Sequence, residues 1–419
     1  MTDASVARVP NGATAILTAT VIAGVAGYGI TWLVYRQIGA APYAVFAAFW
    51  AAIYLVVGGL SGVQQEITRA TRERGPHSGR WSGRVWIFGA STAVIAFAAV
   101  LATAPLWVIP AFPEQGWPLV WPLAVGVASY VLVATVSGSL YGVSEWRSLA
   151  LMIATDGTLR LTLLAVGTSF TQDVIVLAWL VALPFPLTVV LLWPAIRGKV
   201  SGRTELDVGY RALSWNVART VAASAATAVL VSGFPLLIVI AARGQDQAMV
   251  GELIFTLTLT RAPLIVTVMS LQSYFVVRFR DRADAVWATL VPVLAVILAA
   301  AALLAVLGWL LGPAVFAWVT AASFSLDGWL IAILVASSAL IAALCMTGAA
   351  VLARSLHLGY SMGWVLAALI TVVIMLCPLD FFLRLLLAVL VAPVVGLVVH
   401  LGWLLVPRPI RQRGDQTEG

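Results

Sequence analysis

Long apolar runs, separated by short polar or turn-forming segments, extend along the whole chain. A helix needs about 20 apolar residues to cross the hydrocarbon core of a bilayer. Turn residues such as GAAP at 39–42 and PEQGW at 113–117 separate runs of this length. The pattern predicts an all-α polytopic membrane protein. We predict twelve membrane-spanning helices, at 13–35, 43–67, 85–110, 118–142, 148–168, 174–195, 219–241, 249–276, 286–311, 328–353, 360–378 and 383–406.

Composition excludes a water-soluble protein. Of the 419 residues, 62% are hydrophobic and 10% are charged, and the mean hydropathy is +1.03. A soluble fold cannot bury that much apolar surface. The two cysteines, Cys345 and Cys377, lie inside apolar segments and are expected to be small buried hydrophobes, so they indicate no redox compartment.

The positive-inside rule tests the helix count, because basic residues gather in cytoplasmic loops. With a cytoplasmic N-terminus, 19 of the 24 basic residues fall in inner segments and 3 in outer loops or edges, while Arg160 and Arg261 lie within spans. We therefore expect a multi-pass protein of a bacterial inner membrane with both termini in the cytoplasm. The net charge of +7 then describes a rim that faces anionic lipid headgroups, and no nucleic-acid partner is implied.

Two segments of the chain are similar at a nearly constant shift. GLSGVQQEITRATR at 59–72 matches VMSLQSYFVVRFR at 268–280, and the turn IGAAPYAVF at 38–46 parallels RGQDQAMVGELIF at 243–255. These matches predict a duplicated six-helix unit, with a pseudo-two-fold axis along the membrane normal. The predicted parts are an N-terminal lobe at 1–195, a cytoplasmic linker at 196–218, a C-terminal lobe at 219–407 and a cytoplasmic tail at 408–419.

The paired six-helix halves, and the turn that reads Gly and then Tyr-Ala or Val-Gly, resemble the MATE/polysaccharide-flippase (MOP) superfamily. With twelve spans in 419 residues, the chain is most similar to the Wzx-type polysaccharide transporters. The resemblance implies a V-shaped cavity lined mainly by spans one, two, seven and eight, which works by alternating access. It supplies no catalytic residues, so we expect a transporter and not an enzyme.

Arg261 lies in the middle of the predicted eighth span, where a charge costs at least about 2.5–3.5 kcal/mol. No acid lies three or four residues away, and Glu252 is on the opposite helix face, whereas Gln272 shares the face of Arg261. One interpretation is a cavity face whose guanidinium and amide bind phosphate and sugar. The other is a structural arginine that binds backbone carbonyls beside Pro263.

Asp156 and Arg160 are four residues apart in the predicted fifth span. An intrahelical ion pair would make both tolerable in lipid. The functional interpretation is a proton-sensitive switch or a second phosphate contact. If a proton or sodium gradient drives transport, the coupling candidates are Asp156 with Arg160, then Glu66 and Glu252.

The inner end of the predicted second span is polar. Gln65, Arg69 and Arg72, at spacings of four and three, are predicted to share one helical face, and Glu66 lies three residues before Arg69. One interpretation is that these residues only mark the end of the span, with Glu66 paired to Arg69.

The alternative is a polar inner mouth of the cavity, to which both lobes contribute. Gln64 and Gln272 would face each other across the pseudo-axis, and Arg280 would be the equivalent of Arg72. Amides hydrogen-bond sugar hydroxyls, and arginines bind phosphate, so such a mouth suits a phosphorylated sugar.

The predicted first span carries a stripe of small and polar residues, Thr20, Gly24, Tyr28, Thr31 and Tyr35. The stripe either lines the cavity, in which case Tyr28 and Thr31 are substrate-binding candidates, or allows close helix packing.

These residues favour a flippase for a polyprenyl phosphate or diphosphate that carries one or more sugars, used in cell-envelope polysaccharide synthesis. The alternatives are a MATE-type cation-coupled multidrug antiporter, which needs deep carboxylates, and a membrane glycosyltransferase or polymerase that uses polyprenyl-linked sugars. A lipid scramblase or passive channel is also compatible with the composition. No metal-ligand spacing or nucleotide-binding motif is present, so no metal, cofactor or ATP is expected, and the chain is expected to act as a monomer.

Overall fold

The computed structural model describes residues 11–73, 84–200, 204–281, 285–320 and 326–406, and it confirms the all-α polytopic fold class. The N-terminal helices are α1 (Asn11–Ile38), α2 (Ala40–Ala70), α3 (Arg84–Ala111), α4 (Trp117–Gly142), α5 (Trp146–Thr168), α6 (Val174–Ala182) and α7 (Pro184–Val200). The C-terminal helices are α8 (Tyr210–Val231), α9 (Phe234–Ala241), α10 (Gln247–Asp281), α11 (Val286–Val319), α12 (Gly328–Ala353), α13 (His357–Leu376) and α14 (Phe381–Leu405).

The helices fall where the hydropathy pattern predicts spans. Ten described spans are long and apolar enough to cross a membrane, with α6 and α7 together counted as one. A further candidate is the pair α8 and α9, which is bent by 62°. α10 occupies the place of the predicted eighth span, so the predicted count of twelve is compatible with the structure.

The predicted seventh span, 219–241, differs from the observed helices in two ways. The observed helix α8 begins at Tyr210, before the predicted start and inside the predicted linker. The helix then breaks at Ser232 and Gly233, and α9 follows. Proline lacks an N–H and is best accommodated in the first turn of a helix, so Pro235 favours a new helix beginning here. α8 therefore occupies positions 210–218 of the predicted linker.

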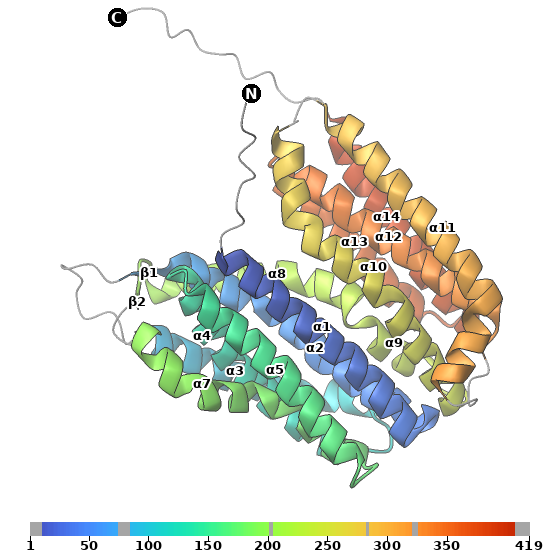
Figure 1. Ribbon diagram of the computed structural model, residues 1–419, viewed down its shortest axis with the longest axis horizontal. Helices are drawn as coiled ribbons and strands as arrows, with labels where there is room; N and C mark the ends of the chain where they lie inside the picture. Colours follow the sequence, from blue (N-terminus) through green and yellow to red (C-terminus); the bar gives the residue numbers. More distant parts are fainter. Residues whose placement is uncertain (1–10, 74–83, 201–203, 282–284, 321–325, 407–419) are drawn as a thin grey trace, which may run out of the picture.

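The same helix pairs recur in the two halves (Figure 1). In the N-terminal lobe α4 is central and packs on α2, α3 and α7, while α1 packs on α5. In the C-terminal lobe α12 is central and packs on α10, α11 and α14, while α8 contacts α13. These are the pairs that a duplicated six-helix unit requires. The turns before α2 and α10 also match, because Gly39 and Gly244 both adopt positive φ, at 81° and 82°.

A short two-stranded sheet, β1 (Thr71–Glu73) and β2 (Thr204–Leu206), lies at one end of the N-terminal lobe, which we call the strand end. The strands are antiparallel, with Arg72 opposite Glu205. α2 ends at Ala70, so the prediction that Arg72 continues the helical face of Gln65 and Arg69 is wrong. Backbone pairing with a segment more than 130 residues away ends the helix there.

Both lobes meet at the opposite end of the bundle, which we call the aromatic end. Tyr35 of α1 stacks on Phe255 of α10 with ring centroids 4.1 Å apart, and Tyr43 of α2 meets the same ring edge-on at 5.7 Å. Gly251 of α10 lies directly against the backbone of Ala40. From this junction the lobes diverge toward the strand end (Figure 1).

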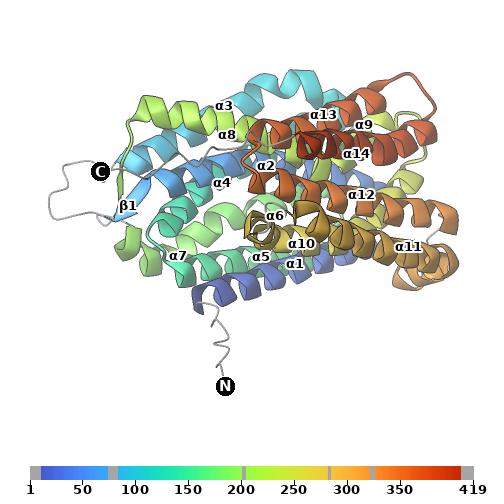
Figure 2. The ribbon, with the colours of Figure 1, turned by 90° about the horizontal axis from the view of Figure 1, so that it is seen from above.

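The α2–α8 seam is a second contact between the lobes. Glycines on α2 face small residues of α8, and a Cβ added at Gly62 would lie only 2.6 Å from the backbone nitrogen of Val221. Glycine allows two membrane helices to approach this closely. Figure 2 shows α1 and α8 on opposite sides of α2, so the seam closes one flank of the space between the lobes.

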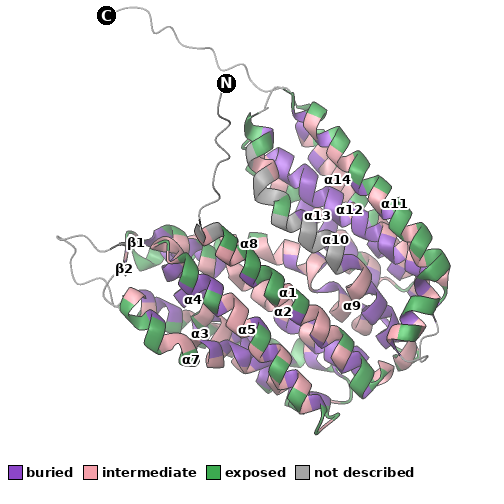
Figure 3. Ribbon diagram, viewed as in Figure 1, coloured by how far each residue is buried: buried purple, intermediate pink, exposed green. Residues whose placement is uncertain are grey.

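The outer faces of the lobes are exposed (Figure 3), and many of their exposed side chains are large and apolar. Leu106 of α3 and Trp318 of α11 are 79% and 81% exposed, and such residues recur along both helices. A soluble protein would bury these side chains, whereas a bilayer solvates them. The exposed faces therefore mark the lipid-facing perimeter.

Candidate functional site

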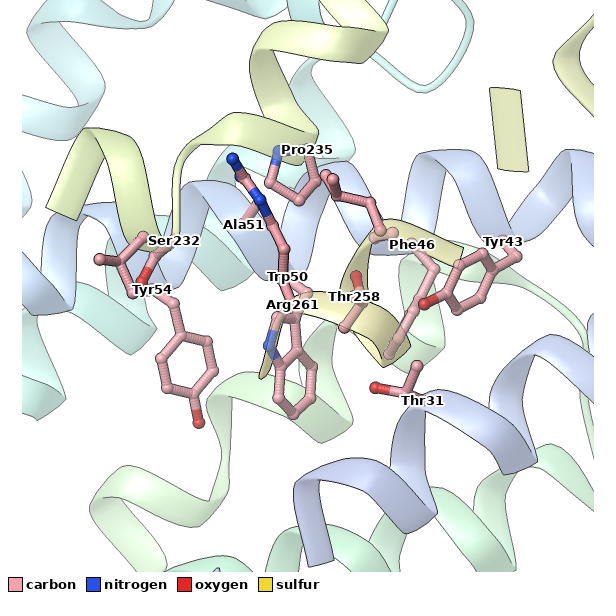
Figure 4. Close-up of a pocket in the computed structure, with 13 residues that line it drawn as sticks. Thr31, Tyr43, Phe46, Trp50, Ala51, Tyr54, Ser232, Pro235, Thr258 and Arg261 are labelled. Atoms are coloured by element: carbon pink, nitrogen blue, oxygen red, sulfur yellow. The ribbon is translucent and has the colours of Figure 1, made fainter. Parts of the chain in front are cut away.

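A cavity of about 220 Å³ lies between the two lobes, and we call it the inter-lobe cavity (Figure 4). Its described lining comes from α1, α2, the α8–α9 bend, α9 and α10. These elements are the predicted spans one, two, seven and eight, which the superfamily resemblance implies as cavity walls. Most of the wall is apolar or aromatic, and Arg261 supplies the one charge among the described lining residues.

Arg261 is 7% exposed and lies in the middle of α10. Its guanidinium carbon lies 4.8 Å from the ring centroid of Phe234, the first residue of α9. Its Nε is buried with no hydrogen-bond partner, and its side chain forms no ion pair with any described residue. The carbonyl-bound structural arginine that the sequence allowed is therefore not what the described residues form.

The break between α8 and α9 shapes the wall that Arg261 faces. Figure 4 shows the Arg261 side chain extending from α10 toward Pro235, with Ser232 on the same side of the cavity. The N-terminus of α9 begins at this bend, and the free N–H groups of a helix N-terminus carry partial positive charge. Broken membrane helices present such ends to anionic groups in several transporters. Arg261 and the α9 N-terminus thus make this wall electropositive.

Aromatic side chains of α2 form the facing wall. Trp50 and Tyr54 stack with ring centroids 4.9 Å apart, and Tyr43 and Phe46 continue the same face. Sequence reasoning missed these residues, although their spacing of three, four and four places them on one helical face. Flat aromatic rings beside hydroxyl groups, such as that of Thr258, suit the mixed apolar and polar faces of a sugar.

A second cavity of about 410 Å³ lies inside the N-terminal lobe, among α1, α2, α4, α5 and α7, and we call it the N-lobe cavity. Arg160 lies in its wall and is 3% exposed. Its Nη1 and Nη2 donate to the two carboxylate oxygens of Asp156 at 2.6 and 2.8 Å. Nη1 also donates to the Tyr54 hydroxyl at 2.6 Å, and Nε donates to the carbonyl of Val181 at 3.2 Å.

Arg160 is therefore a buried charge that is paired with Asp156 and held by hydrogen bonds. The guanidinium also lies over the ring of Phe185 at 4.6 Å. The Asp156 side chain keeps 24% of its surface exposed toward the N-lobe cavity. The ion-pair interpretation of the fifth span therefore describes Arg160 fully, while Asp156 retains an accessible edge.

Two mycobacterial proteins are similar to this chain over almost its whole length. The uncharacterized protein Rv3630 of Mycobacterium tuberculosis is 30% identical over 395 residues, which cover 92% of this chain and 90% of that protein. The uncharacterized protein Rv1510 of the same species is 29% identical over 419 residues, covering 96% and 94%. The chain belongs to their family. No protein-family model matches it.

Solved structures establish the fold of this family member. The lipid II flippase MurJ, in an inward closed conformation, superposes with a TM-score of 0.69 at 12% identity, over 92% of this chain and 86% of MurJ. A multidrug resistance MATE family transporter of the MOP superfamily, in an outward-facing conformation, gives a TM-score of 0.56 at 15% identity, over 94% and 95%. The chain has the MOP fold, which confirms the predicted resemblance at the level of the fold.

The polar residues at the end of α2 lie in different surroundings in this MOP-fold chain. Gln64 lines the N-lobe cavity, so it does not face the other lobe as the sequence predicted. Gln65 is exposed, and its amide donates to the hydroxyl of Ser61 in its own helix at 3.5 Å. The rotation of α2 against α4 and α8, which local sequence does not determine, decides these directions.

Glu66 contacts the other lobe. It is buried, and it accepts a hydrogen bond of 2.7 Å from the hydroxyl of Thr220 on α8. The Nη1 atom of Arg69 lies 3.8 Å from the same carboxylate, but the Arg69 side chain is 74% exposed. The predicted pairing of these two residues is thus present, and Glu66 also extends the α2–α8 seam.

The remaining basic candidates lie away from both cavities. Arg72 pairs with Asp207 at 2.8 Å beside the two strands. Arg280 is exposed at the end of α10, 3.7 Å from Asp281. Its predicted equivalence to Arg72 fails in secondary structure, because α10 continues as a helix to Asp281 whereas Arg72 is in a strand. The side chain of Gln272 lies outside the described residues.

The residues of the predicted stripe on α1 also lie in different surroundings. Thr31 lines the inter-lobe cavity, and its hydroxyl donates to the carbonyl of Gly27 at 3.0 Å, which leaves its oxygen as an acceptor. The hydroxyl of Tyr28 is buried without a partner among the described residues, and Tyr35 belongs to the aromatic end. Glu252 is buried in α10, eight residues after Gly244.

Proposed function

We propose that the protein is a flippase that carries the anionic headgroup of a lipid-linked sugar through the inter-lobe cavity. The observation that supports this most is Arg261, a buried guanidinium without an anionic partner among the described residues, in a cavity with a sugar-compatible aromatic wall. Such a group has lost its hydration and regains interaction energy when a phosphate enters. The substrate would be a polyprenyl-linked sugar, in keeping with the fold shared with a lipid II flippase.

One flank of the inter-lobe cavity suits passage of the lipid tail. The α2–α8 seam is closed by Gly62 against Val221 and by the Glu66–Thr220 hydrogen bond. On the other flank, α1 and α10 meet at the aromatic end through Tyr35 and diverge from there (Figure 1). A tail that remains in the bilayer would enter between α1 and α10, while the headgroup reaches Arg261.

A MATE-type antiporter for cationic drugs fits the inter-lobe cavity less well. Export of cations favours carboxylates in the binding cavity, and its described lining contains Arg261 and no carboxylate. The deep carboxylate of Asp156 lies in the N-lobe cavity and is neutralised by Arg160. A cation near Arg261 would be repelled in a low-dielectric site.

The proposed orientation places the strand end in the cytoplasm, in the inner membrane of a bacterium, with both termini on that side. Basic residues concentrate near this end, as the positive-inside rule expects. The closed aromatic end would face outward, and Trp32 and Arg36 of α1 reinforce it by donating to the carbonyl of Val319 at 3.2 and 3.5 Å. Alternating access would separate these contacts and close the strand end.

Coupling to a proton or sodium gradient is proposed for Asp156. Its exposed edge in the N-lobe cavity is accessible to a proton, whereas its other contacts go to Arg160. Protonation would remove the negative charge that is paired with Arg160 and so weaken the ion pair. Glu66 is the second candidate, because the residue it binds, Thr220, belongs to the other lobe.

Depletion of the protein followed by lipid analysis tests the proposal. We expect a polyprenyl-linked sugar to accumulate in the cytoplasmic leaflet, where a membrane-impermeant periodate treatment of intact cells does not oxidise it. Depletion of an unrelated multi-pass protein is the control. Unchanged lipid-linked sugars together with increased sensitivity to cationic dyes would reject the flippase and favour the antiporter.

A further inference from the structure

We propose that the headgroup bound in the inter-lobe cavity is a single sugar joined to its lipid through one phosphate. This inference rests on the proposed function and narrows its substrate class. It stands on three observations: the number of cations that the cavity offers, the size of the cavity and the length of its aromatic wall.

The described lining offers one cation. A sugar linked to a lipid through one phosphate is a phosphodiester with a single negative charge, and a guanidinium binds such a group in a bidentate manner. Arg261 therefore neutralises it completely. The N-terminus of α9, beside Ser232, contributes only partial positive charge to the same wall.

On α1, Arg36 follows the lining residue Thr31 by five positions, or about 7.5 Å along the helix. Arg36 is nevertheless exposed, lies over the ring of Trp32 and donates to the carbonyl of Val319 at the aromatic end.

On α2, α8 and α10 no further basic residue is this close to the cavity. On α10 the next basic residue is Arg278, 17 positions beyond Arg261, which corresponds to about 25 Å along a helix. On α8, Arg219 precedes the lining residue Val231 by 12 positions, or about 18 Å. On α2, Arg69 follows Tyr54 by 15 positions, or about 22 Å.

Arg160 is closer, but it is not available for a substrate. Its Nη atoms donate to both oxygens of Asp156 and to the hydroxyl of Tyr54, and its Nε donates to Val181. The carboxylate already neutralises its charge. A diphosphate linkage carries two negative charges on adjacent groups, so one of them would enter this apolar cavity without a counter-charge, which is strongly unfavourable.

The size of the cavity limits the sugar portion. Cavities that enclose drug-sized ligands measure about 300–1,000 Å³. The inter-lobe cavity, at about 220 Å³, is below that range. Of the four aromatic residues that α2 contributes to the wall, Trp50 and Tyr54 form the one parallel stacked pair in the described lining, whereas Phe46 is tilted by 43° from Trp50 and Tyr43 is edge-on to Phe255. One such pair offers stacking surface for one ring.

A binding comparison with matched lipids tests the inference. The full-length protein in detergent is titrated with undecaprenyl phosphate glucose and undecaprenyl diphosphate glucose, which differ by one phosphate, and dissociation constants are measured by native mass spectrometry. Because the second charge of the diphosphate has no partner, we expect the monophosphate to bind about tenfold more tightly. The methyl ester of undecaprenyl phosphate keeps the single charge of a phosphodiester and lacks the sugar. It should bind more weakly than the glucose ester, because it lacks the contact with Trp50 and Tyr54.

A charge-addition variant makes the comparison sharper. Thr258 lines the cavity one turn before Arg261, so Thr258→Lys places a second cation on the same face. We expect the preference for the monophosphate to fall by at least about fivefold, whereas the uncharged Thr258→Val should retain it. If Thr258→Lys does not fold, Ser232→Lys supplies the same charge from the α8–α9 bend.

The outcomes separate this inference from the proposed function. Equal or tighter binding of the diphosphate by the wild-type protein overturns the monophosphate inference and leaves the flippase proposal standing. Equal binding of the glucose ester and the methyl ester of undecaprenyl phosphate overturns the single-sugar part. Binding of a cationic dye with no binding of any of the three lipids overturns the proposed function itself.

Discussion

Two arginines of the described part of the chain, Arg160 and Arg261, are buried inside this membrane protein, and their surroundings are opposite. Arg160, in the N-lobe cavity, donates to Asp156, Tyr54 and Val181, so that each of its three side-chain nitrogens has a partner. Arg261, in the inter-lobe cavity, touches the ring of Phe234, and its buried Nε has no hydrogen-bond partner among the described residues. One buried arginine is thus paired and hydrogen-bonded within the protein, whereas the other has hydrogen-bond donors that no described residue accepts.

The difference indicates how to separate structural from functional charges inside a membrane. A buried ion pair with complete hydrogen bonds is self-contained, and breaking it destabilises the fold. A buried cation without an anion contributes little to the fold and is retained at an energetic disadvantage. Arg160 and Arg261 should therefore respond oppositely to removal, one in stability and the other in transport.

The largest expected effect is on stability, from Arg160→Ala. The substitution leaves the Asp156 carboxylate and the Val181 carbonyl without their donor. Loss of one partner of a buried pair destabilises by about 3–5 kcal/mol, and the partial exposure of Asp156 places this case at the lower end. Scanning fluorimetry in detergent tests this prediction, and we expect the melting temperature of Arg160→Ala to fall.

A double variant provides the matched control. Replacing both charges, as in Asp156→Leu with Arg160→Met, removes the pair without leaving a lone charge, so most of the melting temperature should return. If Arg160→Ala alone melts like the wild type, the cluster does not stabilise the lobe and the comparison between the two arginines fails.

Next in size is the effect of Arg261→Ala on transport. We expect a loss of about 100-fold in flipping of a lipid-linked sugar in proteoliposomes, equivalent to about 2.7 kcal/mol, because the phosphate loses its one charged partner. The melting temperature should stay unchanged or rise, since no hydrogen bond to a described residue is lost. Arg261→Lys should recover part of the activity, because it keeps the charge and loses the bidentate geometry.

A fully active Arg261→Ala variant would show that Arg261 is a scaffold residue. An Arg261→Ala variant with both reduced transport and a reduced melting temperature would also show that Arg261 supports the fold. Only loss of transport with retained stability supports the contrast with Arg160.

Sequence reasoning predicted much of this arrangement and missed specific parts of it. The spans follow from hydropathy, because lipid forces each apolar run into a helix. Arg261 stood out because it has no acid at three or four positions, which is a local property. The pairing of Asp156 with Arg160 was also visible from spacing alone.

The parts that failed depend on contacts between distant segments. Arg72 continued a helical period, but the pairing of Thr71–Glu73 with Thr204–Leu206 ended the helix. Gln64 was expected to face the other lobe, yet the packing of α2 directs it into the N-lobe cavity. The aromatic face that includes Trp50 and Tyr54 was readable from its spacing, but aromatic residues on a membrane helix are more often packing residues.

The third expected effect concerns the α2–α8 seam, which bounds the cavity of Arg261 and leaves the Arg160 cluster untouched. Gly62→Ala forces α2 away from the Val221 backbone, and overpacking of this kind costs about 1–3 kcal/mol. Gly24→Ala on α1 is the control, because nothing lies within 4 Å of its added Cβ. We expect a reduced melting temperature and reduced transport for Gly62→Ala only. Equal melting temperatures and transport rates of the two variants would show that α2 and α8 move apart without cost.

The smallest expected effect comes from Tyr54→Phe, which tests whether the two arginines act independently. Tyr54 lines both cavities and accepts a hydrogen bond from Arg160, while its ring stacks on Trp50. The phenylalanine keeps the stack and removes one acceptor, so stability should fall by about 1 kcal/mol. Transport should fall less than threefold, because the phosphate contact of Arg261 does not involve the hydroxyl. A transport loss as large as that of Arg261→Ala would instead mean that the Asp156–Arg160 cluster acts on the inter-lobe cavity through Tyr54. The paired arginine would then act on headgroup binding as well as on coupling.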